Sequence, residues 1–144
     1  MITGVHSATV LVRDQAKALD FYTSTLGFDT LVDNQYGEGM RFLVVAPQGT
    51  THGIALVRPG DVGKSDADIA GFSGLNLLTN DIQQTYQELA GKGVAFVQPP
   101  EQMPWGLWAT WFNDPDGNTF FLSEEQPWSV DTTRASGWSG WHGS

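Results

Sequence analysis

The chain has 144 residues, with sixteen acidic and seven basic side chains that give a formal net charge of −9 at pH 7. This length can bury the core of one compact domain, and the negative charge repels phosphate backbones, so nucleic acid is not expected as a partner. The chain contains no cysteine, which excludes disulfides and thiolate chemistry and leaves three histidines, the carboxylates and the backbone as possible metal ligands.

The first half of the chain is predicted to form a β-α-β-β-β unit. Val5–Val12 is a β-prone apolar run, and Asp14 is placed to cap a helix that ends at Gly27. Three further strands follow, at Phe28–Asp33, Met40–Ala46 and Gly53–Val57, with a turn at Pro47. Residues 58–70 are rich in glycine and aspartate and are predicted to be a surface linker.

The second half repeats this order. It is predicted to contain a strand at Leu75–Leu78, a helix capped by Asp81 and closed by glycines, and a strand at Val94–Val97. Asp81 lies 67 residues after Asp14, and Pro115 lies 68 residues after Pro47. This spacing favours two copies of one unit in an α+β fold, with a single mixed sheet as the alternative.

The last two strands are predicted to form an aromatic hairpin between Pro104 and Glu125. Its first strand carries Trp105, Trp108 and Trp111. Its turn, Asp114–Gly117, has the acceptor, the fixed φ and the glycine that a type I turn uses.

Taken together, these motifs resemble the vicinal oxygen chelate superfamily, which includes glyoxalase I, extradiol dioxygenases and bleomycin resistance proteins. The resemblance covers residues 3–125 and rests on Val12-Arg13-Asp14, Phe21-Tyr22, Leu26-Gly27-Phe28, Asp81, Trp105-Gly106 and the Asp114–Asn118 turn. Glu101-Gln102, Pro104-Trp105-Gly106 and Glu124-Glu125 look most similar to the bleomycin resistance branch. The spacing from Gly106 to Asp114 is one residue longer than usual in this family, which predicts a bulge in the aromatic strand.

The resemblance implies two βαβββ modules whose sheets curl into a U-shaped cup with the helices outside. The expected boundaries are residues 1–58 for the first module, 59–71 for the linker, 72–125 for the second module and 126–144 for a partly disordered tail. Trp128, Trp138 and Trp141 in the tail suggest that part of it docks on the protein.

In metal-dependent members of the superfamily, the first and last strands of each module supply the metal ligands. The corresponding positions here are Ser7, Ala55, Gly74 and Phe121, and none of these side chains is an ordinary ligand. We therefore expect neither a metal nor another cofactor. His6, His52 and Glu124 form the alternative set for a metal-dependent lyase or dioxygenase, and a one-residue shift in register would turn His6 into the cup.

Strand alternation adds further candidates for binding a ligand. Ser7, Thr9 and Asn76 are expected to project into the cup, where Phe121 would make an apolar floor. At least one of Trp105, Trp108 and Trp111 is expected to line it and to stack on a planar or cationic ligand, although core or interface packing is the alternative. Arg41 would join this set if its side chain points inward.

The sequence therefore favours a metal-independent protein that binds and sequesters a planar or cationic hydrophobic compound, similar to bleomycin resistance proteins. The alternative is an enzyme, either a metal-dependent lyase or dioxygenase or a metal-free isomerase or cyclase. With no secretory leader and no run of 18 apolar residues, a cytoplasmic location without a membrane partner is expected. By analogy with the family we expect a homodimer, which light scattering would test.

Overall fold

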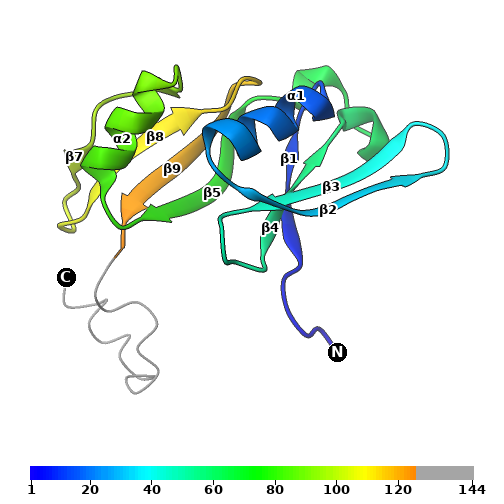
Figure 1. Ribbon diagram of the computed structural model, residues 1–144, viewed down its shortest axis with the longest axis horizontal. Helices are drawn as coiled ribbons and strands as arrows, with labels where there is room; N and C mark the ends of the chain where they lie inside the picture. Colours follow the sequence, from blue (N-terminus) through cyan, green and yellow to red (C-terminus); the bar gives the residue numbers. More distant parts are fainter. Residues whose placement is uncertain (126–144) are drawn as a thin grey trace.

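Each half of the chain forms a βαβββ module with its own sheet, in the computed structural model that describes residues 1–125 (Figure 1). The first sheet has the order β1-β4-β3-β2, with β1 parallel to β4. Its elements are β1 (Ser7–Leu11), α1 (Gln15–Asp20), the π-helical turn η1 (Phe21–Thr25), β2 (Asp29–Tyr36), β3 (Met40–Ala46) and β4 (Gly53–Val57).

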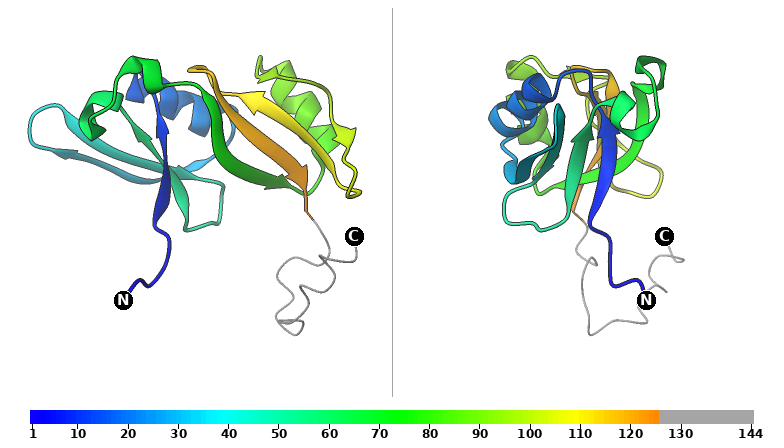
Figure 2. Two further views of the ribbon diagram at one scale, coloured as in Figure 1. Left: turned by 180° about the vertical axis from the view of Figure 1, so that it is seen from behind. Right: turned by 90° about the vertical axis from the view of Figure 1, so that its right-hand side faces the viewer.

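The second sheet has the order β5-β9-β8-β6, and the short strand β7 also pairs with β8. Its elements are β5 (Gly71–Thr79), α2 (Ile82–Gly91), β6 (Ala95–Phe96), β7 (Glu101–Gln102), β8 (Trp108–Asn113) and β9 (Asn118–Glu124). The linker contains two 3₁₀ turns, η2 (Pro59–Val62) and η3 (Asp66–Asp68), and runs over the first module before it enters β5 (Figure 2). The predicted α+β fold is confirmed, and the alternative of one mixed sheet is wrong for the described part of the chain, which forms two sheets.

Both predicted helix caps are present. The Asp14 side chain accepts a hydrogen bond from the Lys17 backbone amide, and the Asp81 side chain accepts one from the Gln84 amide. The predicted turn at Asp114–Gly117 also forms, because the Gly117 amide donates to the Asp114 carbonyl at 2.9 Å. No helix within residues 1–125 is long and apolar enough to cross a membrane.

The bulge predicted in the aromatic strand is wrong, because β8 pairs with β9 without a register shift from Ala109 to Asn113. The irregular pairing lies along the other edge of β8, away from β9. There β6 and β7 together take the place of one continuous strand, and the chain between them contains Pro99-Pro100. Because proline has no amide hydrogen to donate, this dipeptide interrupts the pairing with β8. The irregular pairing along β8 therefore lies in the segment from β6 to β7 and not in β8 itself.

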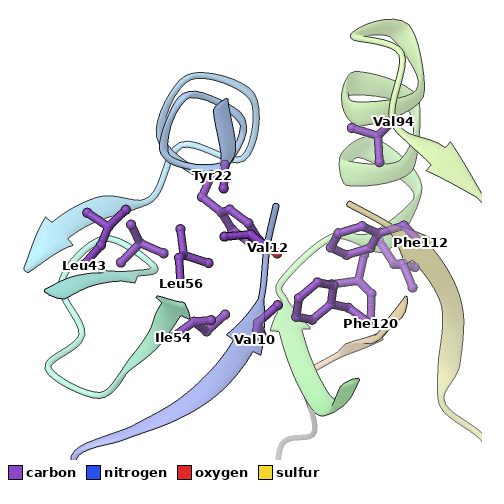
Figure 3. Close-up of a cluster of buried hydrophobic side chains, with 13 residues drawn as sticks. Val10, Val12, Tyr22, Leu43, Ile54, Leu56, Val94, Phe112 and Phe120 are labelled. Atoms are coloured by element: carbon purple, nitrogen blue, oxygen red, sulfur yellow. The ribbon is translucent and has the colours of Figure 1, made fainter. Parts of the chain in front are cut away.

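The apolar core lies on the helix-covered faces of the two sheets and continues from one module into the other (Figure 3). Val10 of β1 and Val12, just after it, lie beneath Tyr22, whose side chain is fully buried. The Tyr22 ring also packs edge-on against Phe120 of β9, with ring centroids 6.2 Å apart. The core therefore joins the two modules as well as each helix to its sheet.

A polar cluster formed by Tyr22, Asp114 and Asn118, here called the module junction, connects the turn of the second module to the first. The Tyr22 hydroxyl donates to the Asp114 carboxylate at 2.7 Å, and the Asn118 side-chain amide donates to the Leu11 carbonyl at 2.9 Å. At the rim, Arg13 forms an ion pair with Asp116 at 3.1 Å. The module junction fixes the DPDGN turn against the end of β1 and the start of η1.

Because of the module junction, we expect the free energy of unfolding to fall at high pH. Burial and the neighbouring Asp114 carboxylate raise the pKa of the Tyr22 phenol above its ordinary value of 10.0. The unfolded chain therefore releases this proton near pH 10 while the folded chain keeps it. The free energy of unfolding should then fall by about 1.4 kcal/mol per pH unit above about pH 10.

Urea unfolding between pH 8 and pH 11.5 measures this slope, and the Tyr22→Phe variant should lack this part of the decline. The matched variant Tyr36→Phe changes an exposed ring and should retain the decline. Parallel pH profiles for the wild type and Tyr22→Phe would contradict the prediction.

Candidate functional site

The face of the second sheet that its helix does not cover carries an aromatic pair near its centre. Trp111 of β8 lies beside Phe121 of β9, with ring centroids 5.1 Å apart and planes at 58°. Asn76 of the edge strand β5 pairs with Phe121 in turn, so its exposed side chain lies beside the same rings. This row of side chains combines two partly exposed aromatic surfaces with one amide that can donate and accept hydrogen bonds.

Large apolar side chains extend this surface. Strand alternation places Phe72 and Leu78 of β5 on the same face as Asn76, and each is 63% exposed. Val97, whose amide donates to the Trp111 carbonyl, is 60% exposed. Sequence reasoning missed these three residues, although counting alternate positions from Asn76 along β5 would have found the first two.

The corresponding face of the first sheet carries polar side chains at its β1 edge. Thr9 of β1 pairs with Ala55 of β4, which pairs with Val44 of β3. Ser7 lies two residues before Thr9 on the same face, and its hydroxyl is 3.0 Å from Nδ1 of His6. The His6 ring stacks on Phe42, with centroids 6.1 Å apart.

The positions singled out by the family resemblance are Ser7 and Ala55 in the first module and Gly74 and Phe121 in the second. Ser7 and Ala55 share one face but pair with Gly53 and Thr9, so they are diagonal neighbours. Gly74 has a φ of +79° and lies where the pairing of β5 with β9 shifts register. None of these four side chains can hold an ion as an ordinary ligand.

The residues of the alternative metal set are dispersed. One Glu124 carboxylate oxygen accepts a hydrogen bond from the Ile82 amide at the start of α2, at 3.2 Å. His52 is exposed in the segment before β4, and His6 is stacked as described above. Within residues 1–125, no three histidine or carboxylate side chains converge in a geometry that could hold a metal ion.

Arg41 lies on the helix-covered side of β3, because it alternates with Phe42 and Val44. Its guanidinium forms two hydrogen bonds of 2.8 Å with Asp33 of β2. These bonds lower the pKa of the Asp33 carboxyl and raise that of Arg41. Arg41 is therefore engaged on the face opposite Thr9 and Ala55.

The three tryptophans predicted in the aromatic strand take different positions. Trp111 lies on the helix-free face, whereas Trp108 has the opposite parity on β8 and is 38% exposed. Trp105 precedes β8 and is 50% exposed. The structure thus brings Trp111, Phe121 and Asn76 together on one sheet, and Ser7, Thr9 and Ala55 together on the other.

Residues 4–122 match the sequence model of the family described as the Glyoxalase/Bleomycin resistance protein/Dioxygenase superfamily. A relative with an uncharacterized role, YetH of Bacillus subtilis (strain 168), is 34% identical over 124 residues, which are 86% of this chain and all of YetH.

Solved structures of the same fold extend this similarity. A member of the glyoxalase/bleomycin resistance protein/dioxygenase superfamily from Sphaerobacter thermophilus is 51% identical, with a TM-score of 0.80, and the match covers 86% of this chain and 98% of that one. TnmS3, described as an antibiotic binding protein from Streptomyces sp. CB03234, is 37% identical, with a TM-score of 0.72 and coverage of 87% and 98%.

Proposed function

Because the chain belongs to the glyoxalase/bleomycin resistance protein/dioxygenase superfamily, we propose that it binds and sequesters a planar hydrophobic small molecule on the helix-free faces of its sheets. The observation that carries this proposal is the Trp111–Phe121 pair beside Asn76. Partly exposed rings at the centre of a sheet give an apolar surface, and a planar compound can stack on the face of one ring. The neighbouring amide provides the kind of polar group that orients a ligand in such sites.

The side chains at the four family positions favour binding over metal-assisted chemistry. Ser7, Ala55, Gly74 and Phe121 provide one hydroxyl, one methyl, one phenyl ring and one bare backbone. A divalent ion in a protein needs several imidazole, carboxylate or carbonyl ligands in a defined geometry. The same positions instead leave room for an apolar ligand and one aromatic contact.

The similarity to TnmS3 supports an antibiotic-like ligand and placement near the bleomycin resistance branch. TnmS3 is described as an antibiotic binding protein, and its similarity spans nearly all of both chains. The net charge of −9 gives a further preference, because an acidic protein attracts cationic ligands in low salt. We therefore favour a planar compound that carries a positive charge.

Replacing Trp111 should weaken binding of such a compound by about 5-fold to 150-fold, because a base-sized ring stacked on an aromatic side chain contributes about 1–3 kcal/mol. Isothermal titration calorimetry with proflavine, a cationic planar dye, neutral anthraquinone and bleomycin provides the panel. The Trp111→Leu variant tests the site. The matched control is Trp108→Leu, which removes a tryptophan of the same strand from the opposite face.

Equal losses in Trp111→Leu and Trp108→Leu would contradict the assigned face, and a panel with no binding compound would count against sequestration. A stoichiometric metal in untagged protein that disappears in His6→Ala would favour the enzyme alternative instead. Calorimetry is preferred to fluorescence because the chain has six tryptophans, whose emission would obscure a single site.

A further inference from the structure

A pocket of about 160 Å³ opens between the two modules, and its lining includes neither Trp111 nor Phe121. Leu78 is the one residue that it shares with the surface around that pair. Leu26 and Pro47 of the first module lie on one side of it, and Leu77, Leu89 and Phe112 of the second module lie on the other. The pocket reaches the edge strand β5, whose outer edge pairs with no other described strand. Its walls are mainly apolar.

The internal repeat shows what is unusual about this pocket. With the 67-residue offset between the modules, Leu89 of α2 corresponds to Tyr22, and Leu77 of β5 corresponds to Val10. Tyr22 and Val10 are 0% and 3% exposed, whereas Leu77 and Leu89 are only partly buried. The side chains at these two corresponding positions are thus buried in the first module and partly exposed in the second.

In the first module, an aromatic ring whose hydroxyl has a hydrogen-bond acceptor fills the space that corresponds to the pocket. The Tyr22 ring fills the space over β1, and its hydroxyl reaches Asp114 in the turn of the other module. In the second module, leucine replaces the ring at position 89, and the turn residue that corresponds to Asp114 at the 68-residue offset is Ala46. Neither residue supplies a ring or a carboxylate. The pocket therefore lies where the first module has an aromatic side chain, and no such side chain fills it.

The polar groups of the pocket do not call for a charged ligand. Its two hydroxyls belong to Thr79 and Thr85, whose oxygens are 2.7 Å apart and hydrogen-bonded to each other. The remaining lining is leucine, phenylalanine and proline. An enclosed cavity of about 150 Å³ lined by leucine, isoleucine and phenylalanine accepts benzene, so the volume of this pocket suits a small aromatic ring.

We propose that this pocket is a second ligand site, which takes a neutral arene of one or two rings in the position that Tyr22 occupies in the first module. This site shares only Leu78 with the surface around the Trp111–Phe121 pair, and it does not rest on the function proposed for that surface. In the first module the Tyr22 hydroxyl donates to the Asp114 carboxylate, and the residue that corresponds to Asp114 for this pocket is Ala46. A phenolic hydroxyl would therefore find no carboxylate acceptor at that position. The ligand is therefore expected to be a hydrocarbon-like ring in preference to a phenol.

Titration of the full chain with toluene, followed by methyl NMR of labelled leucines, tests the proposal. The methyl signals of Leu77, Leu89 and Leu122 should shift together and reach saturation, and p-cresol should bind no more tightly than toluene. The Leu89→Tyr variant places in the second module the ring that the first already has, and should weaken toluene binding at least tenfold. Trp111→Leu, which alters the other site, should leave toluene affinity unchanged.

If Leu89→Tyr does not fold, Leu26→Phe fills the pocket from the opposite wall and should give the same loss. Undiminished toluene binding in a folded filling variant would overturn the proposal. Shifts that depend on Trp111 and spare the three leucines would also overturn it, because they would place the arene on the helix-free face.

Discussion

Replacing Asp114 by alanine is expected to lower the free energy of unfolding by about 4 kcal/mol. The Asp114 side chain is buried and accepts four hydrogen bonds in the module junction. The donors are the Tyr22 hydroxyl at 2.7 Å, the Asn118 amide at 2.8 Å, the Asn118 side chain at 2.9 Å and the Asp116 amide at 3.0 Å. Alanine would leave several of these donors buried without an acceptor, and each such group costs about 1–3 kcal/mol before relaxation.

Urea unfolding of wild type, Asp114→Ala, Asp114→Asn and Tyr22→Phe separates the contributions. Asp114→Asn keeps the shape and one acceptor oxygen, so its loss should be intermediate. Tyr22→Phe removes one donor and leaves an acceptor with three other partners, so its loss should be about 1 kcal/mol. A loss below 1 kcal/mol for Asp114→Ala would show that the module junction contributes little to stability.

Local features of the fold were predictable because their causes are close in sequence. Asp14 and Asp81 each cap a helix through an amide three residues later, and the Asp114–Gly117 turn depends on four adjacent residues. The contact between Tyr22 and Asp114 joins residues 92 apart, and neither periodicity nor turn chemistry indicates such a pairing. The junction therefore became visible only with the structure.

The sequence indicates the face of a side chain where strand alternation is regular. It does not do so where the pairing shifts register or where both faces of a strand are apolar. Thr9 lies beside its partner Ala55 on the helix-free face of the first sheet, and Asn76 lies beside Phe121 on that of the second. Gly74 lies at a register shift that the sequence does not reveal. The face of Arg41 could not be assigned either, because its strand is apolar on both faces and shows no alternation.

The missing bulge in the aromatic strand has a similar explanation. The count from Gly106 to Asp114 compares the length of one segment with the family and does not say which segment of the sheet pairs irregularly. Pairing with β9 requires β8 to be regular, whereas the segment from β6 to β7 lies at the edge of the sheet. An irregularity costs less at an edge, where fewer ladder hydrogen bonds depend on the segment.

Gly53→Ala is expected to lower the free energy of unfolding by about 3 kcal/mol, because this substitution overpacks the centre of the first sheet. A Cβ at position 53 would lie 2.5 Å from the Val45 carbonyl oxygen and 2.7 Å from Cγ1 of Val44. The Val44 side chain can rotate, but the Val45 carbonyl is backbone and can move only if β3 moves away from β4. Since β1 pairs with β4 through Ser7 and Gly53, the displacement would also reach the helix-free face.

Gly60→Ala is the matched control, because a Cβ there meets no atom within 4 Å and the position has no positive φ. It should be neutral or stabilise the protein by up to about 1 kcal/mol, since alanine reduces the entropy of the unfolded chain. Thermal unfolding should show a Tm lower by roughly 6–12 °C for Gly53→Ala and unchanged or higher for Gly60→Ala. Equal Tm values for the two variants would mean that β3 and β4 separate at little cost, and the close approach at Gly53 would then not constrain the first sheet.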